Sequence, residues 1–226
     1  MDTALFFVSL AGMMKKWIPF AITALILASC QQGKQAEETP ATDPNAITCD
    51  GIGPVRLSYS YASLDSAFGA DKLVNETVDV NGETVHITRV FPNEPEEITV
   101  YWAEKAEPYQ TITKLAVSNE FGPYQTEEGI RVGTDLNEIK QLNNFMPVTM
   151  TNFYNSIDGF AVITSFNGGD IETKYPCLGG KLDIVKQRGV DVRLLDEIKP
   201  EAEIKSSHKL FLSIDVEVVE LSVSAH

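Results

Sequence analysis

Apolar residues downstream of residue 46 come in short runs that alternate with polar residues, which is the period of β-strands. Two such runs, 73–80 and 84–91, flank Asn81-Gly82, a dipeptide typical of a two-residue type I′ hairpin turn. Further strands are predicted at 98–102 and 112–118. Short sequential strands separated by turns pair with their neighbours, so the pattern predicts an antiparallel, β-rich α+β fold.

The sequence predicts a strand followed by a short helix at two places in the chain. Val55-Arg56-Leu57 corresponds to Ile130-Arg131-Val132 after a shift of 75 residues, and the apolar positions of the helices that follow correspond as well. Asp135 and Glu138 give the second helix a start similar to a capping box. The pattern favours a tandem duplication of a strand, short helix and β-meander unit, and the alternative is two chance openings of the same kind.

The segment Ile130–Ile139, with its weaker partner Val55–Leu64, resembles the tandem units of β-lactamase-inhibitory-type proteins and of small lipoproteins that assist outer-membrane assembly. The resemblance implies a short helix packed on an antiparallel sheet, with the sheet or its loops binding another protein. Ser58 stands where the second copy has Gly133. No functional residue is carried over from these families.

The predicted organisation has four parts: an export signal (1–29), a flexible tether (30–46), a first α+β unit (47–125) and a second unit with C-terminal strands (126–226). The tether lacks large apolar residues and is rich in Gln, Glu, Thr and Pro, so it cannot bury enough surface to offset its ordering entropy. Near the C-terminus, the apolar alternation that begins at Leu212 shifts phase at Val219, which predicts a bulged strand or two strands.

The N-terminus has the layout of a secretory signal. Lys15 and Lys16 precede the apolar run Trp17–Ala28, which is shorter than the roughly 20 residues needed to span a bilayer. A second apolar stretch lies upstream of the lysines. We therefore expect translation to start at Met13 or Met14, with residues 1–12 outside the natural product.

The signal ends in Leu27-Ala28-Ser29-Cys30, which resembles the lipobox of bacterial lipoproteins. The resemblance implies cleavage before Cys30, a diacylglycerol on its thiol, further acylation such as palmitate, and attachment to a membrane. The alternative, an ordinary signal peptide with a chance cysteine, implies release. In the lipoproteins of one group of bacteria, an Asp after the cysteine retains the protein in the inner membrane, so Gln31 at this position favours the outer membrane. The body would then face the periplasm. The acidic segment Gln35–Glu38 also resembles signals that send some lipoproteins to the cell surface, in which case the body would face the outside.

The formal charge of −14 opposes binding to phosphate backbones, and no cluster of Lys and Arg reverses it locally. We therefore expect no nucleic-acid partner. The expected partners are the membrane, through lipid on Cys30, and a protein of the cell envelope.

Two cysteines remain once Cys30 carries lipid. Cys49 and Cys177 form an even pair in an oxidising compartment, which favours a disulfide between them over two buried thiols. Redox catalysis and zinc binding are disfavoured because there is no C-x-x-C and no paired histidine nearby.

The sequence contains no catalytic motif that we could identify. It lacks G-x-S-x-G, H-E-x-x-H, a Walker loop and a dinucleotide fingerprint, and His86 reads as a surface residue of a hairpin strand. No catalytic residue, metal ligand or cofactor is predicted. Abundant carboxylates leave open a glycan hydrolase that uses a carboxylate pair.

The middle of the chain is rich in aromatic residues and includes Phe121. Its candidate binding residues are Tyr101, Trp102, Tyr109 and Tyr124. Exposed aromatics could stack on sugars or anchor a protein, and the alternative is that alternate members fill the core. Tyr101 and Trp102 are adjacent in a strand and must face opposite sides of the sheet. The sequence thus favours a membrane-anchored, non-catalytic binding or assembly module, with an envelope glycan hydrolase as the alternative.

Overall fold

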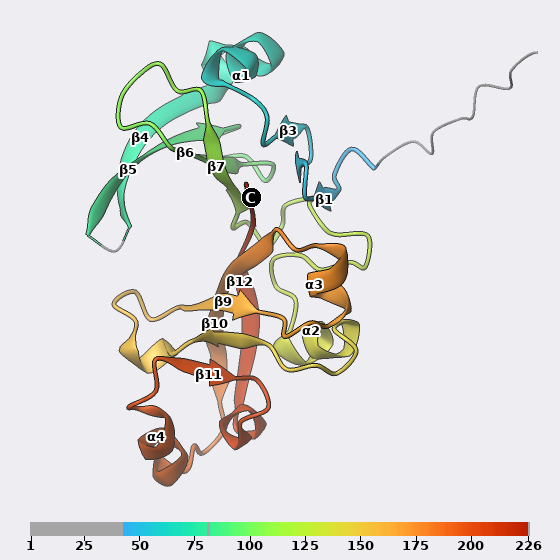
Figure 1. The fold of residues 1–226 in the computed structure, drawn as a ribbon, viewed down its shortest axis with the longest axis vertical. Helices are drawn as coiled ribbons and strands as arrows, with labels where there is room; N and C mark the ends of the chain where they lie inside the picture. Colours follow the sequence, from blue (N-terminus) through green and yellow to red (C-terminus); the bar gives the residue numbers. More distant parts are fainter. Residues whose placement is uncertain (1–42, 81, 226) are drawn as a thin grey trace, which may run out of the picture. The chain divides into compact units, whose positions relative to one another are not determined.

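The computed structural model describes residues 43–80 and 82–225, and within them twelve strands and four α-helices. Nine strands form one antiparallel sheet in the order β11-β8-β9-β10-β12-β7-β6-β5-β4 (Figure 1). A small second sheet has the order β1-β2-β3. The predicted antiparallel, β-rich α+β class is therefore confirmed.

The main sheet consists of β4 (Leu73–Val80), β5 (Glu83–Val90), β6 (Ile98–Trp102), β7 (Ile112–Val117), β8 (Thr149–Thr151), β9 (Ala161–Ser165), β10 (Leu178–Gln187), β11 (Glu203–Lys205) and β12 (Ile214–Ser224). The small sheet consists of β1 (Ile47–Thr48), β2 (Gly51–Ile52) and β3 (Val55–Arg56). The helices are α1 (Tyr61–Phe68), α2 (Leu136–Leu142), α3 (Asp170–Lys174) and α4 (Val192–Ile198), with the 3₁₀ turns η1 (Ala70–Lys72), η2 (Phe153–Asn155) and η3 (Lys209–Leu212).

The sheet is built from two runs of strands, each preceded by a helix. α1 precedes β4–β7, and α2 precedes β8, β9, β10 and β12. The runs join through their last strands, because β7 pairs antiparallel with β12. The first predicted opening is present as β3 followed by α1, whereas Ile130–Val132 form no strand before α2, so the predicted second strand is wrong. The duplication itself and a boundary near residue 125 remain predictions, since residues 40–226 group as one unit.

Local signals placed several elements correctly. β4 and β5 pair residue by residue up to Val80 and Glu83, on either side of the predicted turn. Ser60 and Asp135 cap α1 and α2 by accepting from backbone N–H groups. β12 is one strand whose pairing with β10 shifts register between Glu220 and Val218, so Val219 is the predicted bulge.

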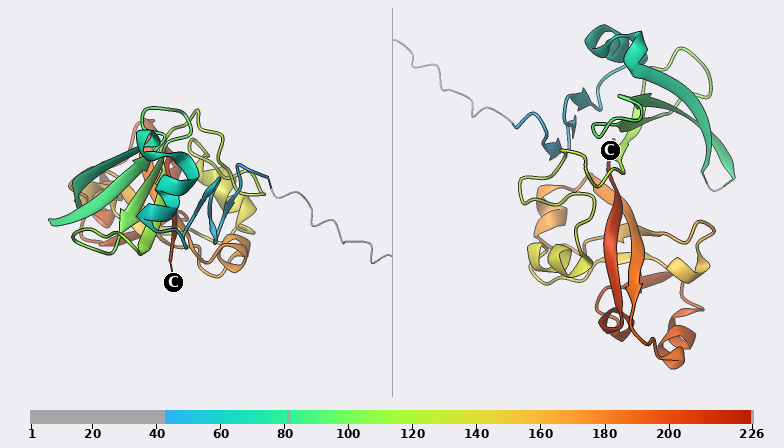
Figure 2. Two further views of the ribbon diagram at one scale, coloured as in Figure 1. Left: turned by 90° about the horizontal axis from the view of Figure 1, so that it is seen from above. Right: turned by 180° about the vertical axis from the view of Figure 1, so that it is seen from behind.

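The hydrophobic core includes residues of the long strands β10 and β12, orange and red in Figure 2, and of the first run of strands. Leu115, Leu182 and Leu221 are fully buried there, and Leu64 is the buried residue of α1. Side chains of this size each contribute roughly 1.5–3 kcal/mol on burial.

A polar chain crosses this packing next to the hairpin. The buried Trp102 Nε1 donates to Thr88 Oγ1 at 2.8 Å, and Thr88 Oγ1 donates to Asn75 Oδ1 at 2.7 Å. The buried Trp102 N–H and Thr88 hydroxyl are therefore both hydrogen-bonded, and side chains link β4, β5 and β6 in addition to the backbone bonds.

The predicted disulfide is confirmed. Cys49 lies between β1 and β2, and Cys177 precedes β10, with their Cα atoms 5.5 Å apart. The disulfide links the small sheet to the residue directly before β10 of the main sheet.

The export signal, Cys30 and most of the tether lie outside the described residues. Within residues 43–80 and 82–225, no helix has the length and apolarity needed to cross a bilayer.

We expect Thr88→Val to lower the free energy of unfolding by about 1–3 kcal/mol, because it leaves the buried Trp102 N–H without an acceptor. Urea denaturation measures the change. Thr84→Val is the control, since Thr84 is exposed on the same strand and its replacement should change stability by less than about 0.5 kcal/mol. Equal effects of the two substitutions would show that the polar chain contributes nothing.

We expect the double substitution Cys49→Ala, Cys177→Ala to lower the free energy of unfolding by about 2–5 kcal/mol, because the bridge closes a long loop in the unfolded chain. The residues are 128 apart in sequence. Adding a reductant should destabilise the parent protein to the level of the variant and leave the variant unchanged. A parent protein whose urea midpoint ignores reductant would contradict the prediction.

Candidate functional site

Three of the four candidate binding aromatics are in the core. Trp102, Tyr109 and Tyr124 are only 3%, 7% and 4% exposed, so they offer no binding surface, and the alternative that members of this segment fill the core holds for these three. Trp102 stacks on Tyr109 with ring centroids 5.6 Å apart. Tyr124 packs where Gly53 leaves room, and its hydroxyl donates to the Glu96 carbonyl. Trp102 and Tyr109 thus cover each other within one segment, whereas Tyr124 packs on a distant part of the chain.

Tyr101 lies on the opposite face from Trp102, as the alternation predicted, but it is not a free aromatic surface. The Lys114 ammonium lies 4.0 Å from its ring centroid, and Lys114 is also paired with Glu220 at 3.2 Å. Burial, followed by the nearby Glu220 carboxylate, raises the pKa of Tyr101 to about 12. Tyr101 is therefore a neutral, half-covered side chain.

His86 is also less free than the sequence indicated. It is half-buried, and its Nδ1 lies 3.0 Å from the Tyr109 hydroxyl. The contact ties the hairpin to the loop before β7.

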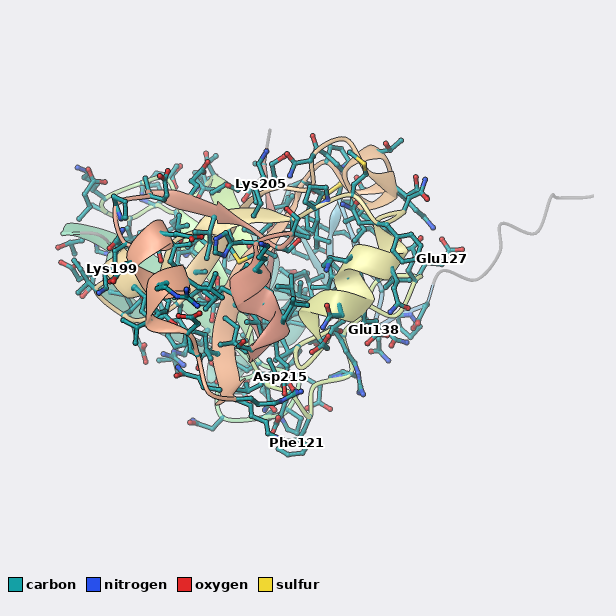
Figure 3. All side chains as sticks on the ribbon, turned by 90° about the horizontal axis from the view of Figure 1, so that it is seen from below. Phe121, Glu127, Glu138, Lys199, Lys205 and Asp215 are labelled. Carbon is teal, nitrogen blue, oxygen red and sulfur yellow. A yellow bond between two sulfur atoms is a disulfide. The ribbon has the colours of Figure 1, made fainter. Side chains whose placement is uncertain are left out.

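The exposed aromatic of this segment is Phe121, which is 80% exposed in the loop after β7. Its N–H donates to Asn119 Oδ1 at 2.9 Å, and the Gly122 N–H donates to the Asn119 carbonyl at 3.0 Å. A Cβ at Gly122 would lie 2.8 Å from the Pro95 carbonyl oxygen, so this turn is packed against the β5–β6 loop. Phe121 is thus held at the periphery of the molecule by a fixed turn (Figure 3).

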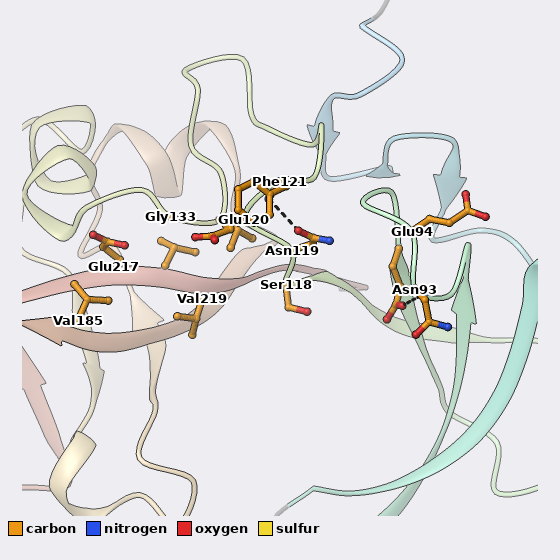
Figure 4. Close-up of a pocket in the computed structure, with 13 residues that line it drawn as sticks. Asn93, Glu94, Ser118, Asn119, Glu120, Phe121, Gly133, Val185, Glu217 and Val219 are labelled. Atoms are coloured by element: carbon orange, nitrogen blue, oxygen red, sulfur yellow. Dashed lines mark hydrogen bonds between the residues drawn. The ribbon is translucent and has the colours of Figure 1, made fainter.

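Phe121 borders a cleft with a volume of about 570 Å³. Figure 4 shows Phe121 and Glu120 on the loop beside the strand that carries Glu217 and Val219. The cleft is lined by Asn93, Glu94, Glu97, Ser118, Asn119, Glu120, Phe121, Val132, Gly133, Val185, Glu217, Val218 and Val219.

The cleft follows from the sheet topology. β12 pairs with β7 only through its last residues, from Leu221 to Ser224. Before that point β12 has another neighbour, because Gly133 N–H donates to the Val218 carbonyl at 2.8 Å and Val218 N–H donates to the Thr134 carbonyl at 3.0 Å. The space between this loop, the β5–β6 loop and the end of β10 is the cleft.

The charged lining is acidic and partly neutralised. Glu94 pairs with Lys72 at 2.7 Å, which raises the pKa of the Lys72 ammonium. Glu97 pairs with Arg89 at 2.7 Å and also accepts from the Asn93 N–H. Glu120 and Glu217 add negative charge without such an ion pair among the described residues.

The lining of the cleft mixes acidic, polar and apolar side chains. It combines carboxylates, amides, valines and one phenylalanine, without histidine or cysteine. The described residues contain no cluster of potential ligands that could hold a metal ion. The described carboxyl with the largest pKa change is Asp158, outside the cleft, where the Ser156 hydroxyl and then Lys181 lower the pKa to about 2. A general acid needs a change in the opposite direction.

Sequence reasoning included Phe121 in the aromatic segment but did not single it out. The local signal was Asn119-Glu120-Phe121-Gly122, a turn-forming asparagine and a glycine around one aromatic in an otherwise polar loop. The other walls of the cleft come from elements up to a hundred residues away and have no common motif.

No protein-family model and no curated protein matches this chain. Among solved structures, it is similar to the crystal structure of the uncharacterized protein yfeY from Escherichia coli, with 12% sequence identity, a TM-score of 0.46, and coverage of 80% of this chain and 99% of that chain.

Proposed function

We propose that this protein is a bacterial envelope lipoprotein, anchored through Cys30, whose β-rich body binds another protein of the envelope without catalysing a reaction. The observation that carries the proposal is Phe121, a large aromatic side chain that is 80% exposed at the border of a cleft. Supporting it, the chain combines this surface with the lipobox-like Leu27–Cys30 and the tether-like segment that follows.

Phe121 has the properties of a binding anchor. Burying a phenylalanine contributes roughly 1.5–3 kcal/mol, and contacts to aromatic residues dominate many interfaces. Because Asn119 and Gly122 already fix the turn, little conformational freedom is lost when a partner covers the ring. The polar residues around it would form the rim of the interface.

The lipid anchor on Cys30 would determine where in the cell envelope this binding takes place. Acyl chains on Cys30 contribute about 0.8 kcal/mol per buried methylene, which holds the mature protein on a membrane. Gln31 after the cysteine supports the outer membrane, with the body in the periplasm or at the surface. A tethered binding module meets envelope partners at a raised local concentration.

A glycan hydrolase is the second candidate, favoured by one observation: Glu94, Glu97, Glu120 and Glu217 line the same cleft. Two of them are engaged by Lys72 and Arg89. Glu120 and Glu217 would therefore be the pair to act on a sugar.

We expect Cys30→Ser to release the protein from membranes, because no thiol remains to carry lipid. Fractionation of envelopes followed by immunodetection measures the distribution, and metabolic labelling with a fatty acid measures acylation. Ser29→Ala is the matched control and should stay labelled and sedimentable. Continued sedimentation of unlabelled Cys30→Ser would refute the lipid anchor.

We expect a photo-crosslinking residue at position 121 to give one discrete adduct in envelopes, and none at position 145. Phe145 is similarly exposed, at 76%, but does not line the cleft. With the crosslinker moved to position 120, Phe121→Ala should reduce the adduct about tenfold, the effect of losing about 1.4 kcal/mol, whereas Phe145→Ala should leave it unchanged.

Equal adducts at positions 121 and 145 would contradict a specific interface at the cleft. Release of sugars from envelope glycan by the purified protein, abolished by Glu120→Gln or Glu217→Gln, would instead identify the hydrolase.

A further inference from the structure

We propose that two copies of this chain pair through the outer edge of β4, in an antiparallel arrangement centred on Thr77. The proposal concerns a strand that contributes no residue to the lining of the cleft, and it does not depend on the proposed function. Its basis is the backbone geometry of β4, the state of its charged side chains and the sequence of the strand.

β4 is the last strand at one edge of the main sheet in the part of the chain that the structure describes (Figure 1). It is eight residues long, and it pairs with β5 without a register shift. Apart from Leu73 and Val78, its side chains are exposed. An edge strand of this length and regularity is a template for pairing with a further strand.

The hydrogen bonds between β4 and β5 show which backbone groups face outward. Phe91 N–H donates to the Lys72 carbonyl at 3.0 Å. Hydrogen-bonded and non-hydrogen-bonded pairs alternate along an antiparallel ladder, so the even-numbered residues of β4 are bonded to β5. Asn75, Thr77 and Asp79 therefore turn their N–H and C=O groups away from the sheet.

The usual protections of an edge strand are missing or already engaged. β4 contains no lysine and no proline, and its ladder has no bulge. Glu76 is paired with Arg89 at 3.0 Å, and Asp79 Oδ1 accepts from the Gly82 N–H at 2.8 Å. Glu76 and one oxygen of the Asp79 carboxylate are thus engaged within their own hairpin, and Asp79 Oδ2 is left to accept from a second copy.

The sequence Leu73–Val80 is complementary to itself when the twofold axis passes through Thr77. Val74 then lies opposite Val80 of the second copy, and these side chains are 39% and 41% exposed in one copy. Asn75 lies opposite Asp79. Since Asn75 Oδ1 accepts from Thr88, its amide NH₂ remains to donate to the second copy's Asp79 carboxylate. Thr77 lies opposite Thr77, and Glu76 opposite Val78.

Neighbouring symmetric registers are worse. Centring the pair on Glu76 places two carboxylates opposite each other, which is destabilising. Centring it on Val78 separates Val74 from Val80 and shortens the ladder. The favoured register is therefore the one that matches apolar with apolar and amide with carboxylate.

Cysteine substitutions in the purified full-length protein test the register under mild oxidation. Thr77→Cys should form a disulfide-linked dimer, because opposite Cα atoms in a hydrogen-bonded pair are about 5.5 Å apart, within the range of a disulfide. Val74→Cys alone should not, since the two copies of residue 74 would be roughly 20 Å apart. A mixture of Val74→Cys and Val80→Cys should link the two variants, while Val80→Cys alone should not. Covalent trapping also detects a weak pairing.

A second measurement tests the backbone bonds. Thr77→Pro removes an N–H that faces outward and leaves the bonds to β5 intact, so it should weaken dimerisation in sedimentation by at least about tenfold while the fold is retained. Thr77→Val is the control and should dimerise like the parent chain. Absence of a Thr77→Cys dimer, equal linkage by Val74→Cys alone, or unchanged dimerisation of Thr77→Pro would each overturn the proposal.

Discussion

The pairing of β7 with β12 is the contact on which the rest of the fold depends. It joins two runs of strands through four residue pairs, from Leu221↔Val117 to Ser224↔Lys114. On the core side, Leu115, Val117, Leu221 and Val223 are at most 5% exposed, so the junction is also the centre of the hydrophobic packing. On the other face, Lys114 joins Glu220 and Tyr101. Without this pairing, the edge of β7 and the end of β12 would lack these backbone bonds, and the buried side chains at the junction would be exposed.

The same pairing explains the cleft. β12 is eleven residues long, and only its last part is paired with β7. Before that part, the backbone of Val218 is hydrogen-bonded to the loop around Gly133. This loop and the turn that carries Phe121 both line the cleft. Because β7 and β12 pair over only a short length, a space remains beside the pairing that is bordered by loops. Binding surfaces are commonly placed on loops. The cleft is a consequence of topology, and its chemistry comes from the residues that happen to border it.

Local rules predicted what local forces decide. Asn81-Gly82 marked the hairpin, the phase shift at Val219 marked the bulge, and the even pair Cys49 and Cys177 marked the disulfide. They could not decide between surface and core for the aromatic segment, because burial of Trp102 and Tyr109 depends on each other and on Thr88, which no periodicity reveals. α3 was also missed, since five residues after Gly168-Gly169 carry too weak a pattern. The cleft could not be predicted, because its walls meet only once the pairing of β7 with β12 has formed.

The two edges of the sheet differ in a way that bears on association. β11 has only three residues, whereas β4 has eight. Short edge strands offer few bonds to a neighbour, so β11 is protected by its length. β4 is instead stiffened from within, because the chain from Trp102 through Thr88 to Asn75 ties it to the core of the sheet. A rigid edge loses little entropy when another strand pairs with it, so the buried polar chain that stabilises the hairpin also prepares its outer side for association.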